Sequence, residues 1–175
     1  GFDIKVKPGD EVEAGDVLSD GLPNPAKVVK HKGVGEGRRY FVKAFKEAMS
    51  DAGLGSPRGT RRNLEVVARG LINHVRLTDE MGDHVPGDVV TYDQLEHSWE
   101  PRPGTRKARG PAAVGKYLER PVLHHSIGTR VTKKMLAELT EFGVTDLDVR
   151  LARRMIELAF FNEYPRHSGD RLNIC

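Results

Sequence analysis

The chain has 175 residues, of which 38% are hydrophobic and 30% are charged, and its net charge is +3. This length suits one domain of ordinary size or two small domains. The single cysteine excludes a disulfide-stapled scaffold and a zinc finger, and no apolar run approaches the roughly 18 residues of a membrane span.

The charges are segregated along the chain. Residues 27–76 hold twelve Lys or Arg against four acids, whereas residues 77–99 hold six acids and no Lys or Arg. A basic block of this kind can bind phosphates by releasing counterions, or it can neutralise acidic segments packed beside it. The composition favours the second interpretation and leaves the first open.

The first twenty residues predict short strands joined by tight turns, without an initiator methionine or a signal-peptide pattern. Ile4 and Val6 alternate with charged residues, so we expect one buried face, and residues 17–18 return to the core. Gly9 and Gly15, each followed by Asp, supply the turns. We therefore expect a segment of a longer, cytoplasmic protein that opens with a barrel-sandwich, or hammerhead-like, module.

Such modules either carry lipoate or biotin on a lysine or serve as structural inserts. The carrier lysine is normally flanked by Met or an acidic residue, and Lys27 has no such flank. The sequence therefore favours the structural use.

Two helices are expected next, over residues 37–49 and 63–72, because their apolar residues recur at helical spacing. In the second helix, Glu65 and Arg69 lie four residues apart on one face, where they can pair. The connector region before and at the start of this helix holds three arginines, Arg58, Arg61 and Arg62.

Taken in order, these motifs resemble the C-terminal part of the bacterial RNA polymerase beta' subunit. Residues 12–21 read V-E-A-G-D-V-L-S-D-G, against V-E-x-G-D-x-(I/L)-S-D-G in that family, and an x-P loop, a K-G turn at residues 32–33 and a helix follow. The family then has H-I-E-V-I-V-R-Q-M-L, in which Glu65 and Arg69 are identical here. Residues 84–90 resemble a further strand turn of the family.

The resemblance implies a DNA-directed RNA polymerase, a nucleotidyltransferase, but the family's catalytic motif is missing from this segment. That motif, N-A-D-F-D-G-D, holds Mg²⁺ on three aspartates, whereas Asp146 and Asp148 form only a pair. We therefore expect no catalytic residue, metal site or cofactor in this segment, and Mg²⁺ only in the parent enzyme. Asn63 and Gly70 depart from the family's His and Gln, which suggests a distant relative, for example one encoded by a phage.

The resemblance also implies a supporting place in the enzyme, where the family's corresponding segment helps close the foot of the polymerase near the small omega subunit. The expected partners are other polymerase subunits or the rest of the same chain. DNA or RNA stays open as a further partner, and no membrane is expected.

Residues 99–116 are expected to form a Pro/Gly-rich linker without regular structure. With the three connector arginines, its basic side chains are candidates for contact with nucleic acid or an acidic partner. These side chains are Arg102, Arg106, Lys107 and Arg109. The alternative is a solvated loop with no such role.

Residues 117–175 predict a strand–helix–strand unit followed by a terminal helix. Thr132 suits the N-cap of a helix over residues 133–142, and a strand is expected over residues 144–149. Residues 151–161 are expected to form the final helix.

Three other site chemistries receive little support. Residues 33–37 could bind phosphate through helix-start amides, but they lack the Gly-Lys-Ser/Thr of a P-loop. His124 and His125 are adjacent, so on a strand their rings would face opposite sides and could not share a metal. Ser126 lies next to a histidine but has no nucleophile elbow around it.

These features together predict an α+β fold in which a short-stranded barrel-sandwich module packs with several helices, divided into residues 1–98, 99–116 and 117–175. The predicted function is a non-catalytic, scaffolding segment of a beta'-like subunit in transcription. The alternatives are a phage structural or virion protein that keeps the fold without polymerase activity, and a small nucleic-acid-binding module. The glycines expected at turns are Gly9, Gly15, Gly21, Gly33 and Gly87.

Overall fold

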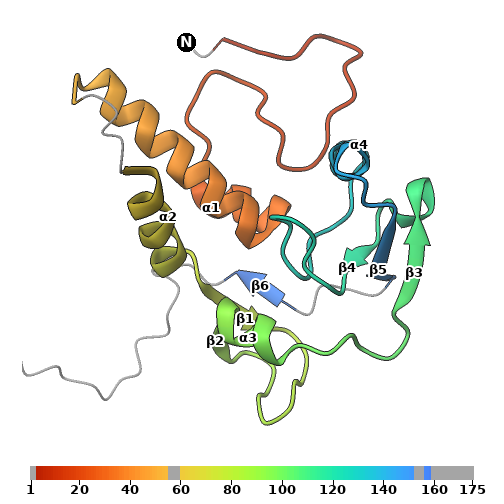
Figure 1. Ribbon diagram of the computed structural model, residues 1–175. Coiled ribbons are helices and arrows are strands. Elements are labelled where there is room, and N and C mark those ends of the chain that lie inside the picture. Colours follow the sequence, from red (N-terminus) through yellow and green to blue (C-terminus); the bar gives the residue numbers. More distant parts are fainter. Residues whose placement is uncertain (1–2, 55–59, 152–155, 159–175) are drawn as a thin grey trace, which may run out of the picture.

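A computed structural model describes residues 3–54, 60–151 and 156–158. These residues form an α+β fold with four α-helices and two three-stranded antiparallel sheets, neither of which closes into a barrel (Figure 1). The elements in chain order are α1 (Pro25–Asp51), α2 (Thr60–Leu71), β1 (His74–Leu77), β2 (Val89–Thr91), α3 (Tyr92–Ser98), β3 (Arg106–Arg109), η1 (Gly110–Ala113), β4 (Tyr117–Leu118), α4 (Lys133–Glu141), β5 (Asp146–Arg150) and β6 (Ile156–Leu158).

Helix α1 begins twelve residues earlier than its sequence pattern indicates. Asn24 caps it by accepting a hydrogen bond from the Ala26 amide at 2.9 Å, and Pro25 occupies the first turn. Gly33 adopts φ 89° and ψ 172°, which breaks the helical path and divides α1 into two pieces. The expected turn at this glycine is therefore a kink inside a longer helix, and the expected helix over residues 37–49 is its second piece. None of the helices in the described part of the chain combines the length and the apolar character needed to cross a membrane.

The first hydrophobic core lies where α1 and α3 meet the sheet of order β2-β1-β6. Its buried residues are Val29, Val34, Ile72, Val75, Leu77, Tyr92, Leu95 and Ile127. The terminal helix expected over residues 151–161 is wrong where the structure tests it, because Ile156–Leu158 forms strand β6 and pairs with β1. The other residues of that expected helix, apart from the exposed Leu151, lie outside the described residues.

A second core belongs to the sheet of order β3-β5-β4 and to helix α4. The expectation of an irregular linker over residues 99–116 is wrong, because this stretch contains β3 and η1 and buries Ala108 and Ala113. Strand β3 pairs with β5 along its whole length, which satisfies backbone groups that a linker would leave to water. Helix α4 follows its sequence pattern, and the Thr132 hydroxyl caps it by accepting from the Met135 amide at 3.2 Å.

The N-terminal segment, residues 3–24, contains a single antiparallel bridge, between Ile4 and Ser19. The Lys5 amide donates to the Leu18 carbonyl at 2.9 Å, so the two ends of the segment lie side by side as the strand pattern suggests. The expected burial is wrong, because Ile4 is 76% exposed and Leu18 is 50% exposed. The alternation of this segment therefore does not mark contact with the cores of the described residues.

Polar contacts hold the N-terminal segment to the rest of the chain. Asp16 accepts from the Lys32 ammonium at 3.1 Å and also pairs with Lys134. Glu13 accepts from the backbone amide of Lys133 at 2.9 Å, at the first turn of α4. Figure 1 shows the segment looping away from the body before it reaches α1. Four of the five expected turn glycines adopt a positive φ, namely Gly9, Gly15, Gly33 and Gly87, whereas Gly21 does not.

Candidate functional site

Glycines at alternate positions of α1 allow a second segment to approach its backbone closely. A Cβ atom on Gly35 would lie 1.6 Å from the His124 carbonyl oxygen, and one on Gly33 would lie 2.3 Å from the Thr129 hydroxyl. The Val34 amide between them donates to the Ser126 hydroxyl at 2.9 Å in a buried contact. Residues 33–37 therefore fasten the 121–131 segment to α1. The Val34 amide is not free to bind phosphate, and Ser126 is buried in a structural contact.

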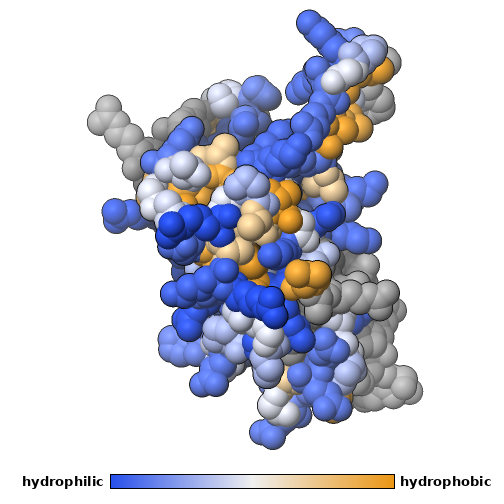
Figure 2. All heavy atoms as spheres, turned by 90° about the vertical axis from the view of Figure 1, so that its right-hand side faces the viewer, coloured by the Kyte–Doolittle hydropathy of each residue, from blue (hydrophilic) through white to orange (hydrophobic). Residues whose placement is uncertain are grey.

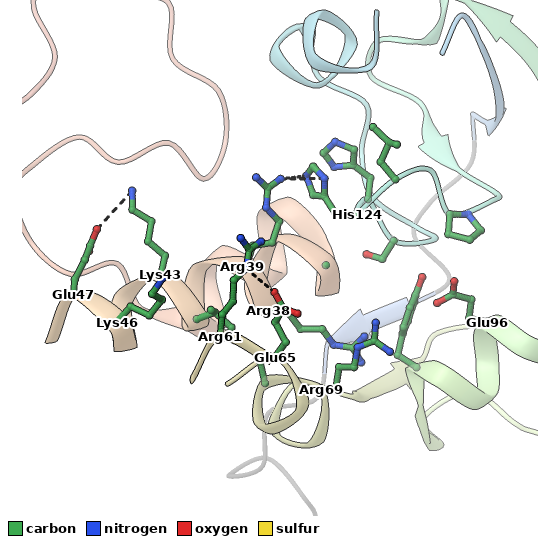
Figure 3. A pocket seen from close by; sticks show the side chains of 18 of the residues that line it. Arg38, Arg39, Lys43, Lys46, Glu47, Arg61, Glu65, Arg69, Glu96 and His124 are labelled. Carbon is green, nitrogen blue, oxygen red and sulfur yellow. Dashed lines mark hydrogen bonds and ion pairs between the residues drawn. The ribbon is translucent and has the colours of Figure 1, made fainter. Parts of the chain in front are cut away.

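A groove of about 820 Å³ runs beside this junction, between α1, α2 and residues 121–126 (Figure 3). Six basic side chains line it, and three acids accompany them: Glu47, Glu65 and Glu96. The bases are Arg38, Arg39, Lys43, Lys46, Arg61 and Arg69. Such a surplus of positive charge in a concave surface concentrates anions near it. We call this surface the basic groove.

The six bases of the basic groove do not have equal freedom. Arg38 is committed to the fold, because it donates to the Ile72 carbonyl at 2.8 Å and pairs with Asp93 at 3.2 Å. Lys46 and Arg69 are exposed and form no ion pair with any described residue. These two side chains are therefore the most available for an anionic ligand.

Of the basic residues selected from the sequence as contacts for nucleic acid or an acidic partner, and lying in the described part of the chain, the structure places only Arg61 in the basic groove, where it pairs with Glu65 at 3.0 Å. The expected pairing of Glu65 with Arg69 is wrong, since Glu65 contacts the base one turn before it instead. Arg62 is exposed on α2, and Arg58 lies outside the described residues. The connector arginines and the basic residues of 99–116 are not gathered into one site.

The four basic residues of the 99–116 stretch have separate environments. Arg106 and Lys107 are exposed on β3, and Arg109 pairs with Asp146 across the sheet at 3.0 Å. Arg102 is turned inward instead, and its Nε atom donates to Glu119 at 3.2 Å. Glu119 is fully buried, so Arg102 is part of the interior and is not a surface contact for nucleic acid.

Sequence reasoning did not select four of the six bases of the groove, Arg38, Arg39, Lys43 and Lys46, because charge density pointed to the connectors and not to the helix. Arg39, Lys43 and Lys46 are spaced four and three residues apart, which places them on one face of α1. This spacing is visible in the sequence, but the opposing contribution of Arg69 from α2 depends on how the two helices pack. That packing rests on Val42, Leu64 and Ala68, which form a small core of their own.

One end of the groove carries a cluster built on the two adjacent histidines. They lie at a tight turn closed by hydrogen bonds between Val122 and His125, not on a strand. The expectation that their rings face opposite sides is therefore wrong, and the ring centroids lie 4.0 Å apart. Figure 3 shows Arg39 of α1 reaching to His124. Burial of the His125 ring, and less strongly the nearby His124, lowers the pKa of His125, although Glu138 acts in the opposite direction.

The chain is similar in sequence to DNA-directed RNA polymerase subunit beta' of several bacteria. It is 28% identical to that of Endomicrobium trichonymphae over 138 residues, or 78% of this chain. It is 31% identical to that of Acetivibrio thermocellus over 120 residues, or 67% of this chain, and 26% identical to that of Petrotoga mobilis over 161 residues, or 82% of this chain. The chain spans only 8–10% of the length of these relatives.

No family model matches the chain, and no solved structure matches it significantly. The sequence relatives agree with one another, however, and their alignments cover up to 82% of the chain. The motifs that resemble the beta' family are thus supported by similarity along much of the sequence. The chain is therefore a divergent beta' segment, related to part of the bacterial DNA-directed RNA polymerase subunit beta'.

Proposed function

We propose that the chain serves transcription as a non-catalytic, scaffolding segment of a beta'-type RNA polymerase subunit in the bacterial cytoplasm. Its partners are then other polymerase subunits or the remainder of its own chain. The acids nearest to a catalytic pattern support a structural role, because Asp146 pairs with Arg109 and Asp148 pairs with Arg120 at 3.1 Å. Both carboxylates are thus engaged in ion pairs at the surface of the sheet.

The observation that carries the proposal is the apolar surface of the N-terminal segment. Five large hydrophobic side chains of this segment are exposed: Ile4, Val12, Val17, Leu18 and Leu22. Isolated exposed apolar residues are ordinary, but five within twenty residues of one segment favour a surface that is covered in the assembled enzyme. Figure 2 shows hydrophobic side chains reaching the surface in patches among hydrophilic ones on one face of the molecule.

The exposed N-terminal segment is also where we propose that a barrel-sandwich module forms. The N-terminal segment has strand-like alternation, two tight turns and one bridge, but no partner strand within the described residues. We propose that strands from elsewhere in the assembled subunit complete the module and bury Ile4 and Leu18. Burial of each such side chain contributes roughly 1.5–3 kcal/mol.

Co-purification tests the scaffolding role. The tagged chain is expressed together with the remaining polymerase subunits of its source, and the complex is isolated by size-exclusion chromatography. Changing Ile4→Lys and Leu18→Lys together is expected to remove the chain from the complex while its thermal midpoint stays the same, because both side chains are exposed. The matched control is Phe142→Lys, an equally drastic change at a 65% exposed side chain on another element. Retention of the double variant in the complex would show that this surface is not the contact.

A second function, contact with a nucleic-acid backbone, is favoured by the basic groove alone. Lys46 and Arg69 face a common concave surface from two helices, which suits a run of phosphates better than a single carboxylate. The acids that line the groove are fewer than its bases. An acidic partner protein is the competing ligand for the same surface.

Fluorescence anisotropy distinguishes these ligands. Duplex DNA, single-stranded DNA and RNA are titrated at two salt concentrations against the chain and against a Lys46→Glu/Arg69→Glu variant. We expect salt-sensitive binding, and a log–log salt slope that is shallower in the variant by about 0.9 for each duplex phosphate that it no longer neutralises. The matched control, Arg106→Glu/Lys107→Glu, reverses the same charge on strand β3 and is expected to bind as the parent does. Undiminished binding by the groove variant would contradict the assignment.

A further inference from the structure

Two histidines and two carboxylates from three separate segments converge at the end of the basic groove. Nitrogen or oxygen atoms of His124, His125 and Glu138 lie within 4.8 Å of one another. Glu36 adds a fourth donor, since its Oε1 atom lies 2.6 Å from Nε2 of His124. Helix α1 supplies Glu36, the turn supplies both histidines, and α4 supplies Glu138.

His125 is the unusual member of this cluster. Its side chain is only 5% exposed, yet neither ring nitrogen forms a hydrogen bond. Its Nε2 atom lies 3.4 Å from Oε2 of Glu138, which is close enough for an ion pair but lacks hydrogen-bond geometry. Leaving a buried polar group unpaired costs about 1–3 kcal/mol, so a buried imidazole facing a carboxylate indicates a ligand between them.

The contacts of His124 point to the same conclusion. Its Nε2 atom lies 2.6 Å from the Glu36 carboxylate and also 2.6 Å from a terminal nitrogen of Arg39. One imidazole nitrogen can donate to the carboxylate or accept from the guanidinium, but it cannot do both. The position between the carboxylates and the imidazoles thus attracts a cation, and Arg39 supplies one from a side chain that is 57% exposed.

We infer that His124, His125 and Glu138, with Glu36 as a fourth ligand, bind a divalent transition-metal ion such as zinc. Imidazole nitrogen and carboxylate oxygen are ligands that zinc accepts at about 2.0–2.2 Å in tetrahedral sites. Ligand atoms around such an ion lie about 3.3 Å apart, so the atoms of His124, His125 and Glu138 have to approach one another by up to about 1.5 Å, while Glu36 moves away from His124 by less than about 1 Å. A cavity of about 240 Å³ beside His125, Glu36 and Glu138 provides the space for this adjustment.

The ion would act as a clip and not as a catalyst. It would join α1, the histidine turn and α4, which the protein otherwise connects through the close approach at Gly35 and the polar contacts around it. Arg39, which already lines the basic groove, would give up its contact with His124, and its charge would become available to an anion in the groove. The metal would therefore stabilise the fold and, by freeing Arg39, also strengthen anion binding in the basic groove.

Calorimetry and thermal unfolding test this inference on the full chain after removal of metals with a chelator. Zinc chloride is expected to bind with one-to-one stoichiometry and to raise the thermal midpoint by about 5–10 °C at a hundredfold excess over Kd. Cobalt(II) serves as a second probe, whose visible spectrum reports tetrahedral coordination by the same residues. Absence of saturable zinc binding by the parent chain would overturn the inference.

Variants assign the binding to this cluster. Glu138→Gln and His124→Ala change partly exposed side chains, and each is expected to weaken zinc binding by about tenfold or more. His97→Ala, at an exposed histidine of α3, is the matched control and is expected to bind as the parent does. Unchanged affinity in both cluster variants would place the zinc elsewhere and overturn the inference.

Arg39→Ala separates a metal site from a purely hydrogen-bonded cluster. If the guanidinium merely competes with the ion, its removal leaves zinc affinity equal or tighter, and zinc restores the stability of the variant. If Arg39 is the intended cation, the variant loses stability and zinc does not restore it. The second result would contradict the metal site even where the parent chain binds some zinc.

Discussion

The N-terminal segment and the module from β3 to β5 are stabilised in opposite ways. The module surrounds a buried apolar core and also buries Glu119, which pairs with Arg102 just before β3. The N-terminal segment contributes no residue to any hydrophobic core of the described chain and is joined to it by ion pairs that reach solvent. The module is therefore stabilised by apolar burial, whereas the N-terminal segment is attached to the described chain by polar contacts.

This difference matters because an ion pair contributes differently to the free energy of unfolding at the surface and in the interior. An exposed pair contributes about 0–1 kcal/mol, since water screens it and both side chains lose freedom. A buried pair gains little over a hydrophobic pair, but loss of one partner leaves an uncompensated charge in the interior. Loss of one partner is therefore costly in the module and cheap in the N-terminal segment, which is compatible with the proposed docking of that segment onto a neighbour.

The largest effect is expected from the buried pair. Glu119→Ala leaves the Arg102 guanidinium without its buried carboxylate partner and with only the exposed Asp79 at 4.0 Å, and Arg102 also lies over the Trp99 ring at 5.5 Å. We expect a loss of about 3–5 kcal/mol in the free energy of unfolding, measured by urea denaturation. Glu100→Ala removes a neighbouring exposed acid and is expected to change it by less than about 0.5 kcal/mol. Similar losses in both variants would remove the contrast between interior and surface.

Smaller changes in the free energy of unfolding, of opposite sign, are expected when two glycines are replaced by alanine. Gly35→Ala places a Cβ atom against the His124 carbonyl, so the turn has to move and the free energy of unfolding falls by about 1–3 kcal/mol. Gly70→Ala meets no atom within 4 Å on α2 and is expected to stabilise the protein by up to about 1 kcal/mol. The change in unfolding free energy of each variant is measured by urea denaturation. Opposite signs for Gly35→Ala and Gly70→Ala would show that close packing, and not helix propensity, determines the effect at Gly35.

Sequence patterns predicted the elements whose cause is local. The cap at Thr132, the helix after it and the break at Gly33 follow from residue types that act within one turn. The linker prediction failed because Pro and Gly at residues 101–104 suggested irregular structure, while the pairing of β3 with β5 depends on residues about forty positions away. Similarly, the basic groove needed the packing of α2 on α1, which no local pattern contains.

The histidine cluster shows the same limit for a site. Adjacent histidines face opposite sides only if the backbone is extended, and Leu123, with φ 52°, instead forms the turn that brings the rings together. Glu36 and Glu138 join them from helices about ninety and fourteen residues away, so no sequence motif connects the four residues. A resemblance to a family points to transcription at a coarse level but not to this arrangement of side chains.

The smallest predicted effect tests how weakly the N-terminal segment is held. Partial burial opposes ionisation of Asp16, but hydrogen bonds from Lys134, the Glu13 amide and Lys32 outweigh it and lower the pKa from 3.8 to about 2. A lowered pKa means that the stabilisation is complete above about pH 4 and is lost as the pH falls through 2. Because both lysines reach solvent, we expect about 1 kcal/mol rather than the full value of the shift.

Urea denaturation of Asp16→Asn and the parent chain at several pH values measures this contribution. The difference in unfolding free energy is expected to be about 1 kcal/mol at pH 6 and to shrink towards zero near pH 2, since protonated Asp16 resembles the amide. Asp83→Asn, at an exposed acid, is expected to give a small difference that does not vary with pH. A difference for Asp16→Asn that persists at pH 2 would mean that packing, and not charge, holds the segment. The N-terminal segment would then be packed firmly against the rest of the chain, and its exposed apolar side chains would not support a weakly held docking segment.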